Sequence, residues 1–352
     1  MKRILAFVLV VLMLLPFASA CGQSELKIEE TVAAETETEA ETAEEVEVSE
    51  TETVAMTPQS PYEQSITRIL ILGSSSSNDV FFQLGRVFKA QGFGGKKYTL
   101  GFLYYSGCEF SEHVEFLSMN KPVYDYYKTS GEAYVREEES TMKHALADEA
   151  WDVIILHPGS ADLKSEDLNL SFRRKIEAFV NEHVPTVHEF GFHLRCPNPN
   201  DPEIWGEDWP VQPPKGYRER LEEQFNFDPA VQYAKNLAVV QKNILTDPTY
   251  VHNVCTGAGM YYAQEVLGIA QTALYRDYTH LSDLGRVLAA YCFYVQFTGE
   301  AIDEVKLDRI PAKARQSRYQ ALGDLVLTED LKYTIKEAAN YSLEHPWDPI
   351  EK

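Results

Sequence analysis

The sequence predicts an α/β domain with a central parallel sheet between layers of helices. Short continuous apolar runs, such as Ile69-Leu70-Ile71-Leu72, are typical of strands that are buried on both faces of a parallel sheet. These runs alternate with segments of helical periodicity between residues 62 and 352, and such alternation indicates a parallel sheet with helices on its faces. That span is long enough for one large domain with a sizeable core.

Five strands are expected, and all are short. They are Arg68 to Leu72, Tyr98 to Tyr105, Asp152 to Leu156, Val187 to His193 and Tyr250 to Cys255. The expected helices are Phe81 to Gln91, Thr141 to Glu149, Leu170 to Glu182, Pro229 to Leu245, Gly259 to Leu267 and Asp283 to Phe297. The last helix is the clearest, because Ser282 occupies the N-cap position and the apolar residues after it follow a core-facing stripe.

A stretch between Cys196 and Tyr217 is rich in Pro, Asn, Asp and Trp and has no period, which predicts a long loop. Long loops in compact domains are often functional rims. Trp205 and Trp209 in this loop could offer a surface on which a sugar stacks. The alternative is that they fix the loop to the core.

The first 20 residues have the composition of a secretory signal. Lys2 and Arg3 precede an apolar run that is too short for a comfortable membrane span and that ends in small residues. The sequence Ala18-Ser19-Ala20-Cys21 resembles a bacterial lipobox, which implies export and a lipid anchor at Cys21 on the extracytoplasmic face of the cell membrane. Ordinary cleavage nearby and free secretion is the alternative.

Residues 21 to 61 predict a disordered acidic tether. Between residues 22 and 60, 12 glutamates against one lysine give a net charge of −11, half of the chain's −22, and large apolar side chains are almost absent. Such a segment buries too little surface to offset its ordering entropy. Subtracting this −11 and the signal's +2 leaves −13 on the domain of residues 62 to 352, which argues against a nucleic-acid partner.

A metal site is not expected. The cysteines at 108, 196, 255 and 292 follow no CxxC spacing, so zinc binding is disfavoured, while both disulfides and separate buried thiols are compatible with export. The stretch from His188 to His193 differs from a zinc-protease motif, because its histidines lie five positions apart instead of four. On a strand these two side chains would point to opposite faces.

The run Gly73-Ser74-Ser75-Ser76-Ser77 has two interpretations. Serine runs are usually solvated linkers. This one directly follows a predicted buried strand and leads into a helix, at the end of the strand where parallel sheets bind ligands. Helix N-terminal amides can stabilise developing negative charge there, but a serine nucleophile also needs a base and an orienting partner.

Asp277 and His280 can supply the base and its partner. Asp277 lies three positions before His280, so its carboxylate can accept from one imidazole nitrogen while the other faces outward, as in the base half of a catalytic triad. A capping or surface contact is the alternative. Four other histidines lie in helical or charged contexts and are expected to be solvated. These are His113, His144, His183 and His345.

These blocks together resemble the SGNH, or GDSL, hydrolase superfamily, which has a serine turn after its first strand and an Asp-x-x-His near its end. The resemblance implies a three-layer α/β/α, flavodoxin-like fold. It implies Ser75 as the nucleophile, with His280 and Asp277 as its partners. It also implies an oxyanion hole formed by Ser75, Gly107 and Ser160, and no metal or organic cofactor.

The segments ILILGSSSS, DEAWDVIIL and YRDYTHLSDLGRVLAA resemble a poorly characterised bacterial branch whose first block reads Gly-Asn-Ser-Phe-Ser. The sequence departs from the superfamily at Ser74, where an Asp or Asn normally braces the turn and where a hydroxyl could form a similar local hydrogen bond. It departs again at Ala161, which replaces the oxyanion-donating asparagine; His157 or Ser160 could substitute for it. The residues expected near the substrate are His157, Gly159 and His193.

The implied function is hydrolysis of an ester through an acyl-Ser75 intermediate. Relatives include esterases that remove acetyl groups from carbohydrates, so the specific prediction is a cell-envelope carbohydrate O-acyl esterase. One alternative is a degenerate domain that binds glycan without cleaving it, which Ser74 and Ala161 favour. Another is the substrate-binding lipoprotein of a transporter, which predicts two α/β lobes. The oligomeric state is not predicted.

Overall fold

The structure, a computed structural model, describes residues 66–92, 97–130, 133–303, 306–307 and 326–349. All of them belong to one compact unit that runs from Pro58 to Lys352. The predicted signal of residues 1–20, the tether of residues 21–61 and the lipidation site Cys21 lie outside the described residues.

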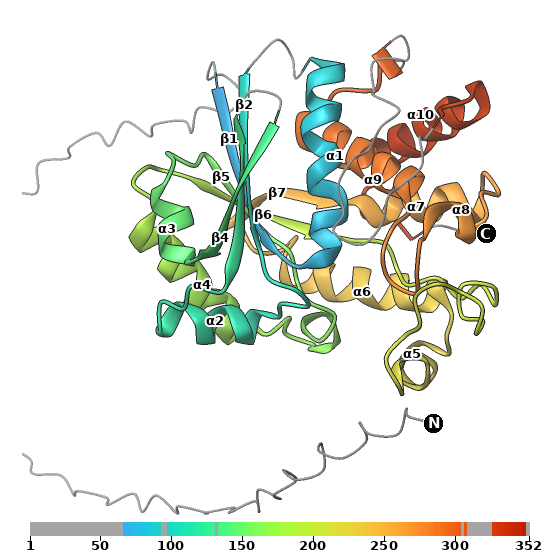
Figure 1. The fold of residues 1–352 in the computed structure, drawn as a ribbon, viewed down its shortest axis with the longest axis horizontal. Coiled ribbons are helices and arrows are strands. Elements are labelled where there is room, and N and C mark those ends of the chain that lie inside the picture. The colour runs from blue at the N-terminus through green and yellow to red at the C-terminus, as the bar shows by residue number, and fades with distance from the viewer. Residues whose placement is uncertain (1–65, 93–96, 131–132, 304–305, 308–325, 350–352) are drawn as a thin grey trace, which may run out of the picture. The chain divides into compact units, whose positions relative to one another are not determined.

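A seven-stranded sheet forms the centre of the described residues, in the order β4-β3-β2-β1-β5-β6-β7 (Figure 1). The five strands from β2 to β7 in that order are parallel to their neighbours. They are β1 (Ile66–Gly73), β2 (Lys97–Tyr104), β5 (Val153–Leu156), β6 (Glu189–Leu194) and β7 (Tyr250–Cys255). These are the five strands expected from the sequence, each within two residues of its expected bounds.

Two strands at one edge were not predicted. β3 (Tyr124–Ser130) pairs antiparallel with β2, and β4 (Ala133–Ser140) pairs antiparallel with β3. β4 reads AYVREEES and has no buried apolar run, so its sequence lacks the signal that marked the other strands. Charged side chains on an edge strand discourage pairing with other chains. The sheet is therefore mixed, with a parallel centre.

The parallel strands are buried on both faces, as their apolar runs predict. In β1, Ile69 and Ile71 belong to one hydrophobic core, whereas Leu70 and Leu72 belong to another on the opposite face. All four side chains are at most 1% exposed. Burying a side chain of this size stabilises a fold by about 1.5–3 kcal/mol relative to exposure, so each strand contributes to both cores.

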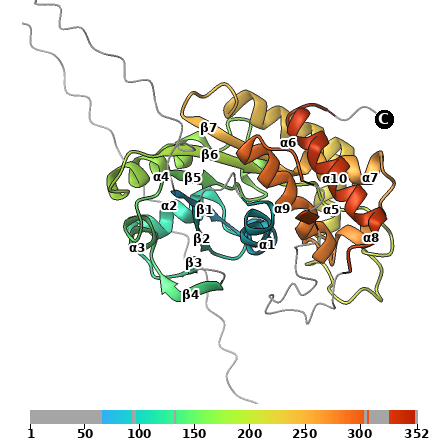
Figure 2. The ribbon, with the colours of Figure 1, turned by 90° about the horizontal axis from the view of Figure 1, so that it is seen from above.

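Helices cover both faces of the sheet (Figures 1 and 2). The first core is completed mainly by α1 (Ser75–Gln91), α7 (Thr256–Glu265), α9 (Asp283–Thr298) and α10 (Glu329–Glu344). The second is completed mainly by α2 (Phe110–Ser118), α3 (Met142–Ala147), α4 (Leu170–His183) and α6 (Pro229–Asn243). The predicted three-layer α/β/α architecture is confirmed.

Each of the six predicted helices is present, and α1 differs most from its prediction. It begins at Ser75, six residues before the expected start, because the backbone N–H groups of Ser77 and Asn78 already donate to the carbonyl of Ser74. The serine run is thus the first turn of a helix and not a linker. Helices α2, α10, α5 (Tyr217–Phe225) and the short α8 (Gln271–Leu274) were not predicted.

Helix α9 is confirmed with one correction. Its predicted N-cap is present, since the Ser282 hydroxyl accepts from the Gly285 N–H at 3.2 Å. The helix is buried nearly all round, however, and does not have a single core-facing stripe. It packs against α1 and α7 and also against α10, so both of its sides are covered.

The long loop after Cys196 is confirmed, because residues 196–216 contain no helix or strand. Trp205 is 9% exposed and donates from Nε1 to the Pro199 carbonyl at 2.9 Å, and Trp209 donates to the Arg276 carbonyl at 2.8 Å. The bond of Trp205 lies within the loop, but its ring packs in the first hydrophobic core, and the bond of Trp209 reaches outside the loop. Both tryptophans therefore fix the loop to the domain, which is the alternative to the sugar-stacking surface.

The cysteines of the described residues are buried free thiols, at 108, 196, 255 and 292. Of the two arrangements that the sequence permitted, the structure has separate thiols and no disulfide among these four. Burial raises the pKa of Cys255 and of Cys292 to about 12. Thiols of this kind are chemically inert at neutral pH.

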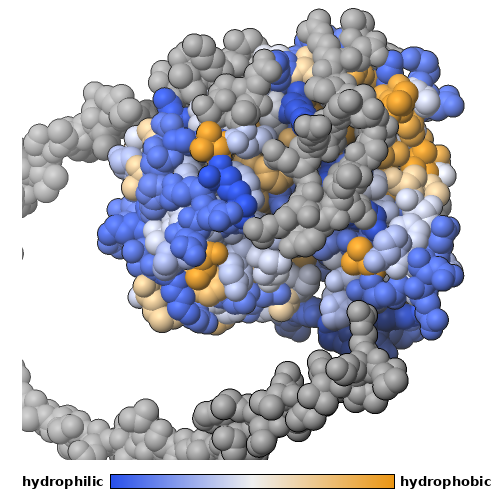
Figure 3. Space-filling view, viewed as in Figure 1, coloured by the Kyte–Doolittle hydropathy of each residue, from blue (hydrophilic) through white to orange (hydrophobic). Residues whose placement is uncertain are grey.

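Hydrophilic side chains predominate on the face seen in Figure 3, and hydrophobic ones form small separate groups. Individual exposed apolar side chains, such as Val187 at 97% exposure, are normal for a folded domain. Among the described helices, none has both the length and the hydrophobicity that a membrane crossing requires.

Candidate functional site

The carboxyl ends of β1, β2, β5 and β6 open at the same edge of the sheet. Gly73, at the end of β1, lies beside Tyr104 of β2, while Leu72 lies beside Leu156 of β5. The chain moves outward from β1 to β2 and later returns to β5 on the other side of β1, so the strand order reverses between β1 and β5. Open α/β sheets bind ligands in the crevice at such a switch point.

Ser75 is the first residue of α1 and is partly exposed at this edge. Its N–H belongs to the helix N-terminal amides, which have no intrahelical carbonyl partner. The preceding residue, Ser74, is 5% exposed and its side chain forms no capping hydrogen bond, so the expected local bracing by this hydroxyl is absent. A Cβ at Gly73 would collide with Ser77 Oγ and lie 3.0 Å from His157 Cβ, so the turn requires glycine.

Asp277 and His280 form the hydrogen bond that their spacing predicts. His280 Nδ1 lies 2.9 Å from Oδ2 and 3.0 Å from Oδ1 of Asp277. The carboxylate also accepts the backbone N–H groups of Thr279 and His280, at 2.9 and 2.8 Å. Burial by itself raises the pKa of Asp277, but the hydrogen bond and charge of His280 and these N–H donors outweigh it and hold the pKa below its usual value.

Asp277 is therefore ionised at neutral pH, and an ionised carboxylate at Nδ1 favours the tautomer with its proton on that nitrogen. Asp277 is 3% exposed, whereas the His280 side chain is 22% exposed. Within the described ranges, Nε2 of His280 has no hydrogen-bond partner. Such an imidazole can act as a general base.

Arg195 connects the segment of His280 to the start of α1. This residue directly follows β6, and its Nη1 donates to Ser76 Oγ at 3.1 Å. The same nitrogen donates to the backbone carbonyl of Thr279 at 3.0 Å and to the Thr279 hydroxyl at 3.1 Å. The guanidinium therefore joins the residue after Ser75 to the residue before His280.

A buried ion pair makes a second connection between the same two segments. Asp79, in the first turns of α1, accepts the Leu281 N–H at 2.9 Å and two N–H bonds from Arg286 at 2.7 and 2.9 Å. Asp79 is 3% exposed and Arg286 is 7% exposed. Ser75, Asp277 and His280 are thus carried by two segments that are joined at two points, although about 200 positions separate them in the sequence.

Gly107 lies in the loop that follows β2, at the same edge. It is exposed and has a φ of +69°, in the left-handed region that favours glycine. A Cβ at this position would meet no atom within 4 Å. The backbone requires glycine here, and the open space beside it is compatible with a small ligand.

The turn from Gly159 to Asp162 is held together by carboxylates. Glu109 accepts the N–H groups of Ala161 and Asp162, each at 3.0 Å, and Asp162 accepts the Gly159 N–H at 2.9 Å. Burial and the neighbouring charge of Asp162 raise the pKa of Glu109 to about 7. The amide of Gly159 is thus occupied within the turn, whereas Ser160 is exposed.

His157 and His193 are placed differently from His280. Each is 1% exposed; His157 Nδ1 lies 3.1 Å from the His193 carbonyl, and His193 Nε2 lies 2.9 Å from Thr256 Oγ1. Burial and the charge of Arg195 lower the pKa of His193 to about 3. The expected substrate contacts by His157 and His193 are not compatible with this placement, because both side chains are enclosed in the interior.

His113 is also buried, and the expectation that it is solvated is wrong. It is 1% exposed, and its Nδ1 lies 2.8 Å from the Tyr124 hydroxyl. Burial lowers its pKa to about 4. Its helical context gave no sign that β3 covers this side of α2.

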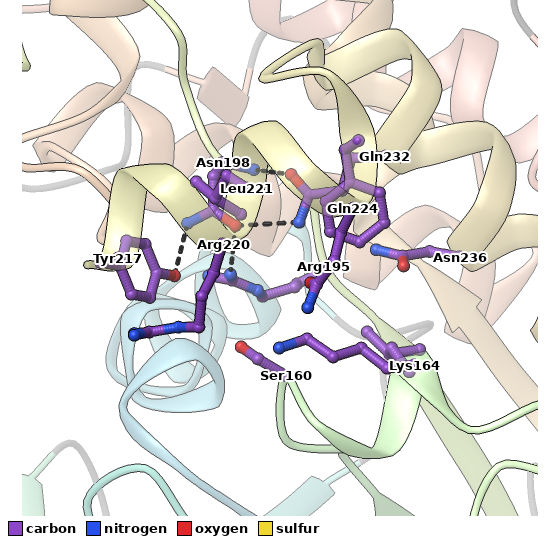
Figure 4. A pocket seen from close by; sticks show the side chains of 12 residues that line it. Ser160, Lys164, Arg195, Asn198, Tyr217, Arg220, Leu221, Gln224, Gln232 and Asn236 are labelled. Atoms are coloured by element: carbon purple, nitrogen blue, oxygen red, sulfur yellow. Dashed lines mark hydrogen bonds between the residues drawn. The ribbon is translucent and has the colours of Figure 1, made fainter.

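A pocket lies beside Arg195 and Ser160 (Figure 4). Ser160 and Lys164 approach it from the segment after β5, and Tyr217 and Arg220 approach it from α5. Its other lining residues are Leu163, Asn198, Leu221, Gln224, Phe225, Gln232 and Asn236. Sequence analysis identified only Ser160 in this set.

The residue order held one signal for this pocket. Arg195 comes directly after a strand that was predicted, at the end where ligands bind, so its position could have been recognised from the sequence. The pocket residues that come from α5 and α6 could not have been recognised, because their position depends on how these helices pack. In the described part of the chain, no group of three or more His, Cys, Asp or Glu side chains is arranged to hold a metal ion.

Comparisons with known proteins identify the fold alone. A scan against protein-family models and a search of curated proteins find no match. The chain is similar to the crystal structure of a DUF4886 family protein from Bacteroides uniformis, with a TM-score of 0.63 and 18% identity over 81% of this chain and 98% of that chain. A likeness at this identity shows a shared fold but no shared activity.

A candidate SGNH hydrolase from Slackia heliotrinireducens aligns with a TM-score of 0.36 and 13% identity, over 67% of this chain and 100% of that chain. A TM-score this low is no evidence of a shared fold. The α/β/α assignment therefore depends on the sheet and helix layers described above and on the similarity to the Bacteroides uniformis protein.

Proposed function

We propose that this protein is a serine hydrolase that acts on ester bonds, with Ser75 as nucleophile, His280 as general base and Asp277 as the orienting carboxylate. One observation carries the proposal. A partly exposed imidazole is hydrogen-bonded at Nδ1 to a buried, ionised carboxylate, and Arg195 joins its segment to the start of α1. This is the arrangement of base and orienting group that an activated serine requires.

In the proposed reaction, Ser75 Oγ attacks the ester carbonyl while His280 Nε2 accepts the hydroxyl proton. The electron pair moves to the carbonyl oxygen and returns as the ester C–O bond breaks, and the imidazolium protonates the leaving alkoxide. Water then attacks the acyl-Ser75 ester, again losing its proton to His280. This second half releases the acid and restores the serine.

The proposed oxyanion hole uses the amides of Ser75 and Gly107, with Ser160 as its third member. A helix N-terminal amide and a glycine in an open loop are suitable donors to a developing negative charge. Ala161 has no side-chain donor, and its own N–H is bound to Glu109. Losing one donor lowers the rate by about 10² to 10³ in enzymes where it was removed, so a modest rate is expected.

We further propose that the substrate is an O-acylated, most simply O-acetylated, carbohydrate of the cell envelope. The support is the resemblance of the sequence blocks to SGNH hydrolases, including the branch with a Gly-Asn-Ser-Phe-Ser block, together with the lipobox-like sequence at Cys21. A lipid-anchored, exported enzyme would meet such substrates.

A glycan-binding domain without activity is the second candidate, and Ala161 favours it, since the expected donor is missing. The transporter-lipoprotein alternative has less support, because it predicts two α/β lobes and the strands of the described residues form one sheet.

Labelling with a fluorophosphonate tests the proposal. The full-length wild type is expected to be labelled, and Ser75→Ala is expected to lose the label, because the probe reacts with an activated serine. Ser118→Ala is a control, since Ser118 is an exposed serine whose hydroxyl donates to the Glu115 carbonyl of its own helix, α2. Equal labelling of wild type and Ser75→Ala, or no labelling of either, would contradict the proposal.

A further inference from the structure

The pocket beside Arg195 has a charge opposite to that of the chain. The protein has a net charge of −22, yet Lys164, Arg195 and Arg220 all line this one pocket. Among the twelve residues that line it in the described part of the chain, none is Asp or Glu. A local concentration of positive charge in an acidic protein indicates selection for an anionic group.

The charge of Arg195 is not neutralised by the protein. The acceptors of its Nη1 and Nη2 are the hydroxyls of Ser76 and Thr279, the Thr279 carbonyl and Asn198 Oδ1, all uncharged. In the described ranges, its Nε has no acceptor. The Nε–H and one of the two Nη2–H groups are therefore left as donors for a ligand.

Lys164, from the segment after β5, and Arg220, from α5, bring two further cations to the pocket (Figure 4). Both side chains are exposed, and within the described residues neither forms an ion pair with a carboxylate. The Arg220 guanidinium lies over the Tyr217 ring, 5.3 Å from its centroid, which holds the charge at the wall of the pocket.

Asn236 provides an independent sign of a ligand. It lines the pocket from α6 and is 4% exposed, and its side-chain amide has no hydrogen-bond partner in the described part of the chain. A pocket-lining amide without a partner in the protein is left to hydrogen-bond solvent or a bound molecule. An amide of this kind is suited to donate to an oxygen of a bound molecule.

The pocket adjoins the proposed reaction site at two residues. Ser160 lines it and is also the third proposed member of the oxyanion hole, and Arg195 donates to Ser76, the neighbour of the proposed nucleophile. Its cavity volume is about 30 Å³. Since a water needs about 10–15 Å³ on such a measure, the space suits a compact group and not a whole sugar ring.

We propose that this pocket binds a carboxylate of the substrate, so that the ester hydrolysed is an acidic one, for example an acetylated uronic acid. The inference rests on the proposed function of Ser75 and His280. The carboxylate accepts the unused N–H groups of Arg195, with Lys164 and Arg220 adding positive charge and the Asn236 side-chain amide donating a further hydrogen bond. This contact selects the substrate and takes no part in bond breaking.

Paired esters test this selection. The full-length protein is given 4-acetoxybenzoate, which carries a carboxylate, and 4-acetoxybenzamide, its neutral counterpart. The ratio of kcat/KM for the two is expected to be about tenfold in favour of the acid, in line with hydrogen bonds to a charged group. Lys164→Gln and Arg220→Gln are each expected to reduce that ratio about threefold, and 0.5 M salt to reduce it further, because these charges are exposed and screened.

Arg218→Gln is the matched control. Arg218 lies on α5, two positions from Arg220, and its substitution removes the same charge. Its guanidinium stacks on Phe227 and does not line the pocket. Its ratio is expected to equal that of the wild type. An equal rate on both esters, or an equal fall of the ratio in Arg218→Gln and Arg220→Gln, would overturn the inference while leaving ester hydrolysis intact.

A binding measurement separates this inference from the proposed function. Thermal unfolding of the full-length protein is followed with galacturonate or galactose at equal ionic strength. Galacturonate is expected to raise the midpoint of the wild type, and less so that of Arg220→Gln, whereas galactose has no such effect. If neither ester is cleaved but this shift occurs, the esterase proposal fails and the anion pocket stands. Without the shift, and without an ester preference, the pocket assignment fails.

Discussion

His193 and His280 lie near the same guanidinium and have opposite surroundings. Arg195 follows His193 by two positions and hydrogen-bonds Thr279, the residue before His280. His193 is 1% exposed, bonded to the Thr256 hydroxyl, and its pKa is lowered to about 3. His280 is part-exposed and bonded to an ionised carboxylate.

The difference shows what a histidine needs in order to act as a base at this edge of the sheet. The buried pair of His157 and His193 has neutral polar partners and a low-dielectric environment, which keeps both imidazoles uncharged. The Asp277 carboxylate can stabilise an imidazolium on His280, and solvent reaches that ring. The buried pair of His157 and His193 stabilises the fold, while the pair of Asp277 and His280 is suited to proton transfer.

Removing the imidazole of His280 should have the largest effect, and that effect should be on the rate of ester hydrolysis. His280→Gln is expected to lower kcat/KM for an acetyl ester by up to about 10⁶, as when a triad base is lost, while stability changes by about 1 kcal/mol or less. Ester assays and urea denaturation measure the two quantities. His144→Gln, at an exposed histidine on α3, is the control. A loss smaller than tenfold would remove His280 from the mechanism.

Breaking the buried ion pair of Asp79 and Arg286, which joins α1 to the segment of His280, should mainly affect stability. Asp79→Asn removes the carboxylate that is hydrogen-bonded to the Arg286 guanidinium, which is 7% exposed, and leaves it only the longer contact with Asp283 at 3.8 Å. A fall of about 3 kcal/mol in the free energy of unfolding is expected. By comparison, Lys121→Gln breaks the exposed pair with Glu115 and is expected to change stability by less than about 1 kcal/mol. Equal effects of the two substitutions in urea denaturation would show that Asp79 has no such role.

The buried histidine predicts a pH dependence of stability. Since the pKa of His193 is lower in the folded state than in the unfolded chain, the unfolded state binds the extra proton, and stability is lost as the pH falls below about 6.5. Between pH 6.5 and 5, this group contributes a loss of about 2 kcal/mol. His193→Leu should be less stable than wild type at pH 7 but lose less on acidification. Parallel curves for the two proteins would argue against a buried neutral His193.

The smallest change in stability with pH is expected from Glu109, and it has the opposite sign to that from His193. The folded-state pKa of this carboxyl is raised to about 7, so its contribution to stability is present below its unfolded value and is lost as the pH rises through 7. The full linkage value between pH 5 and pH 7.5 is about 2 kcal/mol. Because Glu109 is only partly buried, solvent screening lowers it, and the wild type should lose about 1 kcal/mol relative to Glu109→Gln. Differential scanning at several pH values measures this difference, and a wild type that gains stability over that interval would refute it.

The strands and the cap of α9 could be predicted because their signals are local. An apolar run, a serine before a helix or an Asp three positions before a His depends only on neighbouring residues. The β3–β4 edge was missed because an exposed, charged strand has no apolar pattern. The burial of His113 was missed for a related reason, since the group that covers it, Tyr124, comes from that same edge.

The sequence by itself determined the central sheet, the serine turn after β1 and the pairing of Asp277 with His280. Only the tertiary structure decided that Arg195 joins the two segments, that His193 is enclosed, and that three cations meet in one pocket beside Ser160. The physical reason is distance along the chain. Arg195 lies 119 positions from Ser76 and 84 from Thr279, so these contacts depend on how the strands are ordered, which no short pattern encodes.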